Sequence, residues 1–143
     1  MTREVAFHFN APDKVGYACR LLRKAYRSGA RLWVRVPDDL LGALDSALWT
    51  QVPGDFIPHS RPDDPDAMRA RSPIHLATDV QPDASRQVLV NLAPDLPPHA
   101  DTYERVIEVV TLEAHDRDAA RQRWRQYKGM GLEPLRHDLK LAS

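Results

Sequence analysis

Residues 4–49 read EVAFHFNAPDKVGYACRLLRKAYRSGARLWVRVPDDLLGALDSALW, and their spacing of apolar residues indicates the fold class. Apolar side chains alternate in residues 4–9, which predicts a strand that breaker residues then end. In residues 14–27 apolar positions recur every three or four residues between basic ones, which is typical of an amphipathic helix. Residues 31–36 predict a second strand, and residues 38–49 a second helix with an aspartate as its N-cap. This order of strands and helices predicts an α/β protein with a mostly parallel sheet.

The rest of the chain extends the same pattern. Short apolar runs at residues 74–77, 88–92 and 103–110 predict three further strands. Residues 116–130 predict a last helix, which a glycine ends. Residues 60–73 hold three prolines, three aspartates and three arginines, which favours a long surface loop. We therefore expect a single domain over the whole chain, with three α/β/α layers and a mostly parallel central sheet.

Composition narrows the class of protein. The chain has 143 residues, of which 43% are apolar and 28% are charged, and this length suffices for one hydrophobic core. No apolar run is long enough to span a membrane, and no charged-then-apolar leader begins the sequence, so we expect a cytoplasmic protein without membrane contact. The single cysteine, Cys19, lies on the apolar side of its predicted helix. We interpret it as a core residue, which leaves no internal disulfide and no cysteine-based zinc site.

Signatures of nucleotide enzymes and of metal sites are missing from the sequence. The turn after the first predicted strand, residues 10–13, has no glycine that would let backbone amides close around a phosphate. Gly129 and Gly131 follow a helix instead of a strand, which is the wrong context for a dinucleotide fingerprint. The six histidines are too far apart in the sequence to form a ligand pair on one helix. We therefore expect no cofactor, no metal and no catalytic activity.

Acidic and basic residues balance over the chain, with twenty of each, but they are segregated. Residues 38–66 carry seven acids against one base, whereas residues 117–140 carry seven bases against three acids. The zero net charge argues against a protein that coats nucleic acid by bulk charge. The molecule is nevertheless expected to have one acidic and one basic region.

The predicted last helix carries the most informative side chains. At about 100° per residue, four of its cations fall within an arc of about 80°, with Trp124 at the edge of that arc. We call these cations the basic stripe: Arg117, Arg121, Arg125 and Lys128. Three interpretations stay open. The stripe can be a solvated helix surface, a receptor for a carboxylate-bearing peptide with an aromatic side chain, or a track for a single-stranded phosphate backbone with a base stacked on Trp124.

A second feature consists of three large hydrophobic residues near a turn: Trp49, Phe56 and Ile57. Taken alone, Trp49 is explained equally well as a residue on the core side of its predicted helix. Together, the three residues would form the type of patch that a partner protein buries. We therefore expect a second partner surface here, away from the basic stripe.

Several motifs follow one another from the first helix to the last: Ala18-Cys19-Arg20-Leu21, Leu44-Asp45-Ser46-Ala47-Leu48-Trp49, Asp55-Phe56-Ile57-Pro58-His59, Val90-Asn91-Leu92, and residues 103–110 and 120–128. In this order and at this spacing they resemble the chi subunit family of bacterial DNA polymerase III holoenzyme. The resemblance implies a Rossmann-like fold that binds no nucleotide, and a non-catalytic adaptor in DNA replication.

The same resemblance implies a partner for the basic stripe. Members of the family bind the acidic C-terminal tail of single-stranded DNA-binding protein, which ends in phenylalanine, through basic residues of the last helix. The basic stripe stands where the family has these cations. Val110 and Trp124 stand beside the pocket for the terminal phenylalanine, although the family usually has tyrosine at the position of Trp124. Direct binding of single-stranded nucleic acid by the same helix is the alternative.

The second implied partner is the psi subunit or another component of the clamp loader. The family contacts it through the area that includes Trp49 and Phe56. The adaptor would then reach DNA only indirectly, through the protein that coats the single strand. In residues 60–73 this chain is rich in proline and aspartate, where the family has a glycine-rich sequence.

Overall fold

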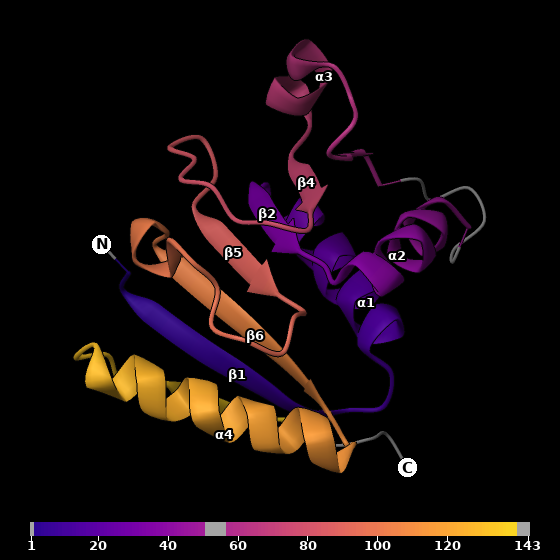
Figure 1. Cartoon of the computed structure of the whole chain (residues 1–143). Helices are drawn as coiled ribbons and strands as arrows, with labels where there is room; N and C mark the ends of the chain where they lie inside the picture. Colours follow the sequence, from indigo (N-terminus) through magenta and orange to yellow (C-terminus); the bar gives the residue numbers. More distant parts are fainter. Residues whose placement is uncertain (1, 51–56, 140–143) are drawn as a thin grey trace.

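A computed structural model describes residues 2–50 and 57–139 of the chain. Its centre is one sheet of seven strands in the order β3-β4-β2-β5-β6-β1-β7, in which every neighbouring pair is parallel (Figure 1). The strands are β1 (Glu4–Ala11), β2 (Leu32–Arg35), β3 (His59–Ser60), β4 (Ile74–Ala77), β5 (Val88–Asn91), β6 (Arg105–Thr111) and β7 (Leu135–Asp138). The predicted α/β class with a parallel sheet is confirmed.

Helices cover both faces of the sheet. They are α1 (Lys14–Arg27), α2 (Asp38–Thr50), α3 (Asp66–Arg71) and α4 (Ala114–Gly129), with a 3-10 turn at Ala100–Thr102. α1 and α2 pack against each other on one face, and α4 lies on the other face over β6 and β1 (Figure 1). These are the three layers that the alternation of strands and helices predicts.

Each face of the sheet has its own core, because successive side chains of a strand point to opposite faces. The core under α1 and α2 is formed by aliphatic residues such as Leu22, Val34, Leu44, Ile74 and Val90. The core under α4 combines aliphatic residues with four buried aromatic ones, Phe7, Trp33, Tyr103 and Tyr127. Cys19 is completely buried in the first core, which confirms that it is a core residue, and burial raises the pKa of its thiol to about 11.

The start of α1 is occupied by a side chain of the protein itself. Asp13 caps the helix, and its carboxylate accepts a hydrogen bond from the backbone N–H of Gly16 at 2.8 Å. In nucleotide-binding folds of this type, the corresponding helix N-terminus holds a phosphate. In this chain, the Asp13 carboxylate already satisfies one backbone N–H group at that end of the helix.

Two segments differ from the prediction. Residues 60–73 are not one loop, since they begin at the end of β3 and contain α3. None of the residues of α3 is buried, and all four residues of β7 are exposed. Elements of this kind have no hydrophobic side to produce a periodic pattern in the sequence, which is why α3 was not predicted and the chain after α4 had no predicted structure.

A half-buried histidine, His8, and a buried one, His75, make the stability of this fold depend on pH. Burial lowers the pKa of His8 to about 4, and the neighbouring His137 and Arg105 act in the same direction. Burial also lowers the pKa of His75 to about 4, together with two nearby arginines. Both side chains are thus neutral in the folded chain and bind protons more readily once it unfolds, where their pKa is about 6.5. We expect the urea midpoint of unfolding to fall as the pH is lowered from about 6.5 to about 4.

The variant His75→Gln provides the control for this pH dependence. Glutamine does not titrate, and its amide can replace the hydrogen bond that joins His75 Nδ1 and the Ser60 hydroxyl at 2.8 Å. The fall of the midpoint should therefore be shallower in this variant than in the parent chain. An equally steep fall would show that His75 does not contribute to it.

Candidate functional site

A pocket lies where α4 meets the outer strands β1 and β7. It has a volume of about 280 Å³ and is lined by six side chains, namely Phe9, Arg117, Arg121, Trp124, Arg125 and Arg136. Four of these, Arg117, Arg121, Trp124 and Arg125, belong to the α4 residues that the sequence predicts as a site, and the fold brings them together. Phe9 from β1 and Arg136 from β7 were not predicted. The pocket thus joins four guanidinium groups to an aromatic surface.

The apolar part of the pocket belongs to a cluster of aromatic rings. The ring centroid of Trp124 lies 5.1 Å from that of Phe7 and 6.4 Å from that of Phe9. Phe7 is fully buried and stacks with Phe9 at 5.8 Å, which supports the pocket from below. The guanidinium carbon of Arg136 lies 4.8 Å from the centroid of the Phe9 ring in a cation–π contact. A further aromatic ring can therefore pack next to Trp124 and Phe9.

The four arginines of the pocket differ in how they are paired. Arg121 forms an exposed ion pair with Asp118 at 2.7 Å, and Arg136 forms one with Asp138 at 3.3 Å. Within residues 2–50 and 57–139, neither Arg117 nor Arg125 has an acidic partner. Exposed ion pairs contribute little to stability, so an incoming carboxylate can replace Asp118 at small cost. The pocket is therefore suited to a ligand with several negative charges.

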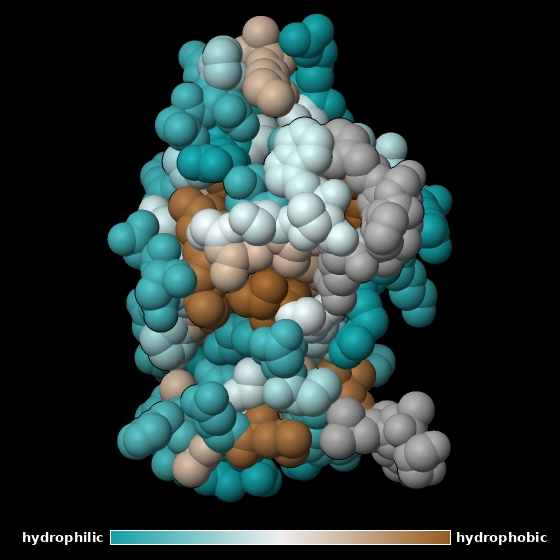
Figure 2. All heavy atoms as spheres, turned by 90° about the vertical axis from the view of Figure 1, so that its right-hand side faces the viewer, coloured by the Kyte–Doolittle hydropathy of each residue, from teal (hydrophilic) through white to brown (hydrophobic). Residues whose placement is uncertain are grey.

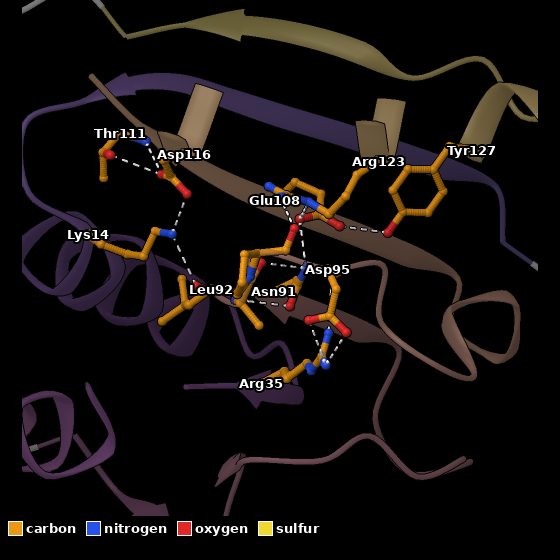
Figure 3. A network of polar contacts seen from close by, with 12 residues as sticks. Lys14, Arg35, Asn91, Leu92, Asp95, Glu108, Thr111, Asp116, Arg123 and Tyr127 are labelled. Atoms are coloured by element: carbon orange, nitrogen blue, oxygen red, sulfur yellow. Dashed lines mark hydrogen bonds and ion pairs between the residues drawn. The ribbon is translucent and has the colours of Figure 1, made fainter. Parts of the chain in front are cut away.

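A buried polar network holds α4 against the sheet (Figure 3). One carboxylate oxygen of Glu108 on β6 accepts hydrogen bonds from Arg123 Nε at 2.9 Å and from the Asn91 amide at 2.8 Å, and the other accepts one from the Tyr127 hydroxyl at 2.7 Å. Arg123 also donates from Nη1 to the carbonyl oxygen of Pro94 at 2.6 Å. Glu108 and Arg123 are 0% and 1% exposed. These hydrogen bonds compensate the Glu108 carboxylate for the water that it has lost, whereas Nη2 of Arg123 is buried without a hydrogen-bond partner among the described residues.

The network determines which side of α4 faces outward. Arg123 and Tyr127 are one helical turn apart and both point to the sheet, so Arg121 and Arg125 must point away from it. Burial raises the pKa of Glu108, against the opposing effect of the Arg123 guanidinium and of the donors around it. Burial and the Glu108 carboxylate also raise the pKa of the Tyr127 hydroxyl, which stays protonated as a donor. The sequence pattern alone does not predict this network.

A second set of contacts fixes the start of α4. Asp116 accepts hydrogen bonds from the backbone N–H and the hydroxyl of Thr111, at 2.7 and 2.9 Å, and forms an ion pair with Lys14 at 2.9 Å (Figure 3). Lys14 also donates to the carbonyl oxygen of Leu92 at 3.1 Å. Burial alone would raise the pKa of Asp116, but the hydrogen bonds from Thr111 and Lys14 outweigh it and the pKa is lowered. The N-terminal end of α4 is thus tied to both β6 and α1.

Two of the residues predicted for this site do not line the pocket. Val110 is completely buried in the core under α4, where it supports the helix from below, and its predicted position beside the ligand stays a prediction. Lys128 is exposed on α4, one turn beyond Arg125, and lies outside the pocket lining. Lys128 can extend the positive surface along the helix but does not form the pocket itself.

The residues predicted for the second partner surface differ in their exposure. Trp49 at the end of α2 is 56% exposed, so a large part of its side chain lies outside the core. Ile57 is 1% exposed and belongs to the core under α1 and α2, so its assignment to a partner surface is wrong. Phe56 lies outside the described residues. The side of the molecule that carries α1 and α2 shows hydrophobic side chains amid a mostly hydrophilic surface (Figure 2).

Metal-binding clusters and membrane-spanning helices are both absent from the part of the chain that the structure describes. In it, histidine, cysteine and acidic side chains form no group of three or more that could hold a metal ion. In the same residues, the helices are too short or too polar to cross a bilayer.

Comparison with known proteins identifies the family. Residues 1–134 match the family described as DNA polymerase III chi subunit, HolC. DNA polymerase III subunit chi of Pseudomonas aeruginosa is 33% identical over 123 residues, which are 85% of this chain and 84% of that protein. The proteins of the same name from Escherichia coli and Haemophilus influenzae are 26% and 24% identical, over 79% and 80% of this chain and 77% and 79% of their own length. The chain therefore belongs to the family of DNA polymerase III chi subunits, which are accessory and not catalytic subunits of a replicative polymerase.

Proposed function

We propose that this chi-family chain is a replication adaptor that binds the acidic, Phe-terminated C-terminal tail of single-stranded DNA-binding protein and links it to the clamp loader. The observation that carries the proposal is the pocket in which four arginines surround Phe9 and Trp124. Membership of a replication family supports the same role. No step of this function requires catalysis by the chain.

Each part of the pocket suits one part of such a tail. The terminal phenylalanine ring packs beside Trp124 and Phe9, since aromatic rings favour tilted and offset contacts with one another. The terminal carboxylate and the acidic side chains before it pair with the guanidinium groups, whose planar donors match carboxylate oxygens. Because these cations are exposed to water, added salt should weaken the complex.

Direct binding of single-stranded nucleic acid is the second candidate. The same cations can follow a phosphate backbone, and the partly exposed ring of Trp124 can stack on a base. The zero net charge of the chain disfavours this function, because domains that bind nucleic acid directly are usually basic.

Two parallel titrations separate these functions. One uses a short acidic peptide that ends in Pro-Phe, and the other a single-stranded oligonucleotide, both at low and at moderate salt. We expect the peptide to form a one-to-one complex, and amidation of its terminus or removal of its phenylalanine to weaken binding at least tenfold. Oligonucleotide binding in the absence of peptide binding would support the second candidate and refute the first.

The contact with the clamp loader is proposed to involve Trp49. Its ring is 56% exposed and lies 5.8 Å from the ring of His59, on the side of the fold opposite to α4. The variant Trp49→Ala should reduce the affinity for the psi subunit at least tenfold, because exposed tryptophans often dominate such interfaces. Its free energy of unfolding should change by about 1 kcal/mol or less. Size-exclusion chromatography with psi and urea unfolding measure the two quantities.

The acidic peptide serves as the control for Trp49→Ala. It should bind this variant with unchanged affinity, because Trp49 is not part of the pocket at α4. Unaltered binding of psi by Trp49→Ala would show that this side of the molecule is not the clamp-loader contact.

A further inference from the structure

Strand β7 is an open edge of the sheet. It is the last strand in the order, it pairs with β1 alone, and all four of its residues are exposed. The opposite edge, β3, has only two residues, and both are buried. Exposed edge strands present unpaired backbone N–H and C=O groups to which another extended chain can add.

The backbone groups that β7 presents can be named. The N–H of Leu139 donates to the carbonyl oxygen of Phe9 at 2.9 Å, so residue 139 directs its backbone groups toward β1. Backbone N–H and C=O groups alternate in direction from one residue of a strand to the next, so those of His137 also point toward β1. Arg136 and Asp138 therefore direct their N–H and C=O groups outward, and within the described residues nothing pairs with them.

The open edge borders the pocket at α4. Arg136 has its backbone groups at the edge and its side chain in the pocket lining, over the Phe9 ring. A strand paired with β7 would lie about 4.8 Å from it. At that distance, every second side chain of the added strand points toward α4, where Arg117, Arg121 and Arg125 line the pocket.

We propose that the acidic segment before the terminal phenylalanine of the bound tail adds to the edge of β7 as an extended strand. This inference rests on the proposed function and specifies how the tail is held. Backbone hydrogen bonds to Arg136 and Asp138 fix the path of the segment, and its acidic side chains on one side of the strand meet the arginines. The positive charge of the groove selects an acidic occupant, and the short edge limits the paired segment to a few residues.

Amide hydrogen exchange at single-residue resolution tests the proposal. When the acidic, Phe-terminated peptide is added to the full chain, exchange at the N–H groups of Arg136 and Asp138 should slow at least tenfold. The N–H of His137 already pairs with β1 and should change little. If the peptide binds and requires its terminal phenylalanine while Arg136 and Asp138 exchange as before, strand addition is wrong and the proposed function stands. If the peptide does not bind, both proposals fail.

A pair of substitutions gives an independent test. Asp138→Pro removes one outward N–H group without removing a hydrogen bond to β1, and proline is tolerated on edge strands. Asp138→Ala removes the same side chain but keeps the N–H group. The proline variant should bind the peptide at least threefold more weakly than the alanine variant. Equal affinities of two variants with the same unfolding midpoint would contradict the proposed hydrogen bonds.

Discussion

Replacement of Arg123 by methionine is expected to lower the free energy of unfolding by about 3–5 kcal/mol. Methionine fills a similar volume and favours helix, but it leaves the Glu108 carboxylate buried without its charged partner. The remaining donors, Asn91 and Tyr127, cannot neutralise that charge. Urea unfolding at pH 7 measures the loss. The difference in stability between the variant and the parent chain should narrow at lower pH, because protonation of Glu108 then removes the unpaired charge.

The matched control for this prediction lies two residues further along α4. Arg125→Met removes the same side chain from an exposed position in the pocket, without an acidic partner among the described residues. Its free energy of unfolding should change by less than about 0.5 kcal/mol. Equal stability losses in Arg123→Met and Arg125→Met would mean that the buried network does not hold α4 in place.

The double variant Arg121→Ala, Arg125→Ala is expected to bind the acidic peptide about 30- to 1,000-fold more weakly than the parent chain. Each arginine supplies a charge-assisted hydrogen bond that is partly open to water, worth about 1–2 kcal/mol. The sum of two such losses corresponds to this range of weakening, because a tenfold change in the dissociation constant corresponds to about 1.4 kcal/mol. Isothermal titration calorimetry measures the change directly.

A second double variant separates the pocket from the overall charge. Arg20→Ala, Arg71→Ala removes two exposed cations from α1 and α3, away from the pocket. It has the same net charge as the first double variant and should retain most of the affinity for the peptide. Similar losses in both variants would indicate attraction by net charge alone and would contradict a specific site at α4.

The fold was predictable because its central elements bury one side or both. β4 and β5 are completely buried and appear in the sequence as apolar runs, and α1 shows its apolar side at helical spacing. The short elements at or beyond the edges of the sheet bury too little to leave such a pattern. For the same reason, α3 and β7 emerge only from the structure.

The residues of the candidate site on α4 were predictable from the sequence, whereas those on β1 and β7 were not. Arg117, Arg121, Trp124 and Arg125 belong to one helix, so the helical repeat alone brings them together. Phe9 and Arg136 are far apart in the sequence, and only the pairing of β7 with β1 places them in the same pocket.

Buried charge was the other difficulty. The sequence contains a signal for the pair of Glu108 and Arg123: a glutamate inside the apolar run of β6, and an arginine four residues before a tyrosine on α4. This signal does not by itself predict burial, because charged residues are rarely fully buried. Ile57 illustrates the reverse error. It directly precedes Pro58, where the sequence predicts a turn, and the packing that buries it comes from distant parts of the chain.

The position of β1 in the sheet has a consequence for the order of folding. β1 precedes the other described strands in the chain, yet among the described residues it pairs with β6 and β7, so that Glu4 lies opposite Arg105 and Ala6 opposite Leu135. Contacts between such distant parts of a chain form slowly. On the ribosome, β1 must wait without these strand partners until β6 and β7 have emerged. A nascent chain is therefore unable to assemble the pocket at α4 before β7 has been synthesised.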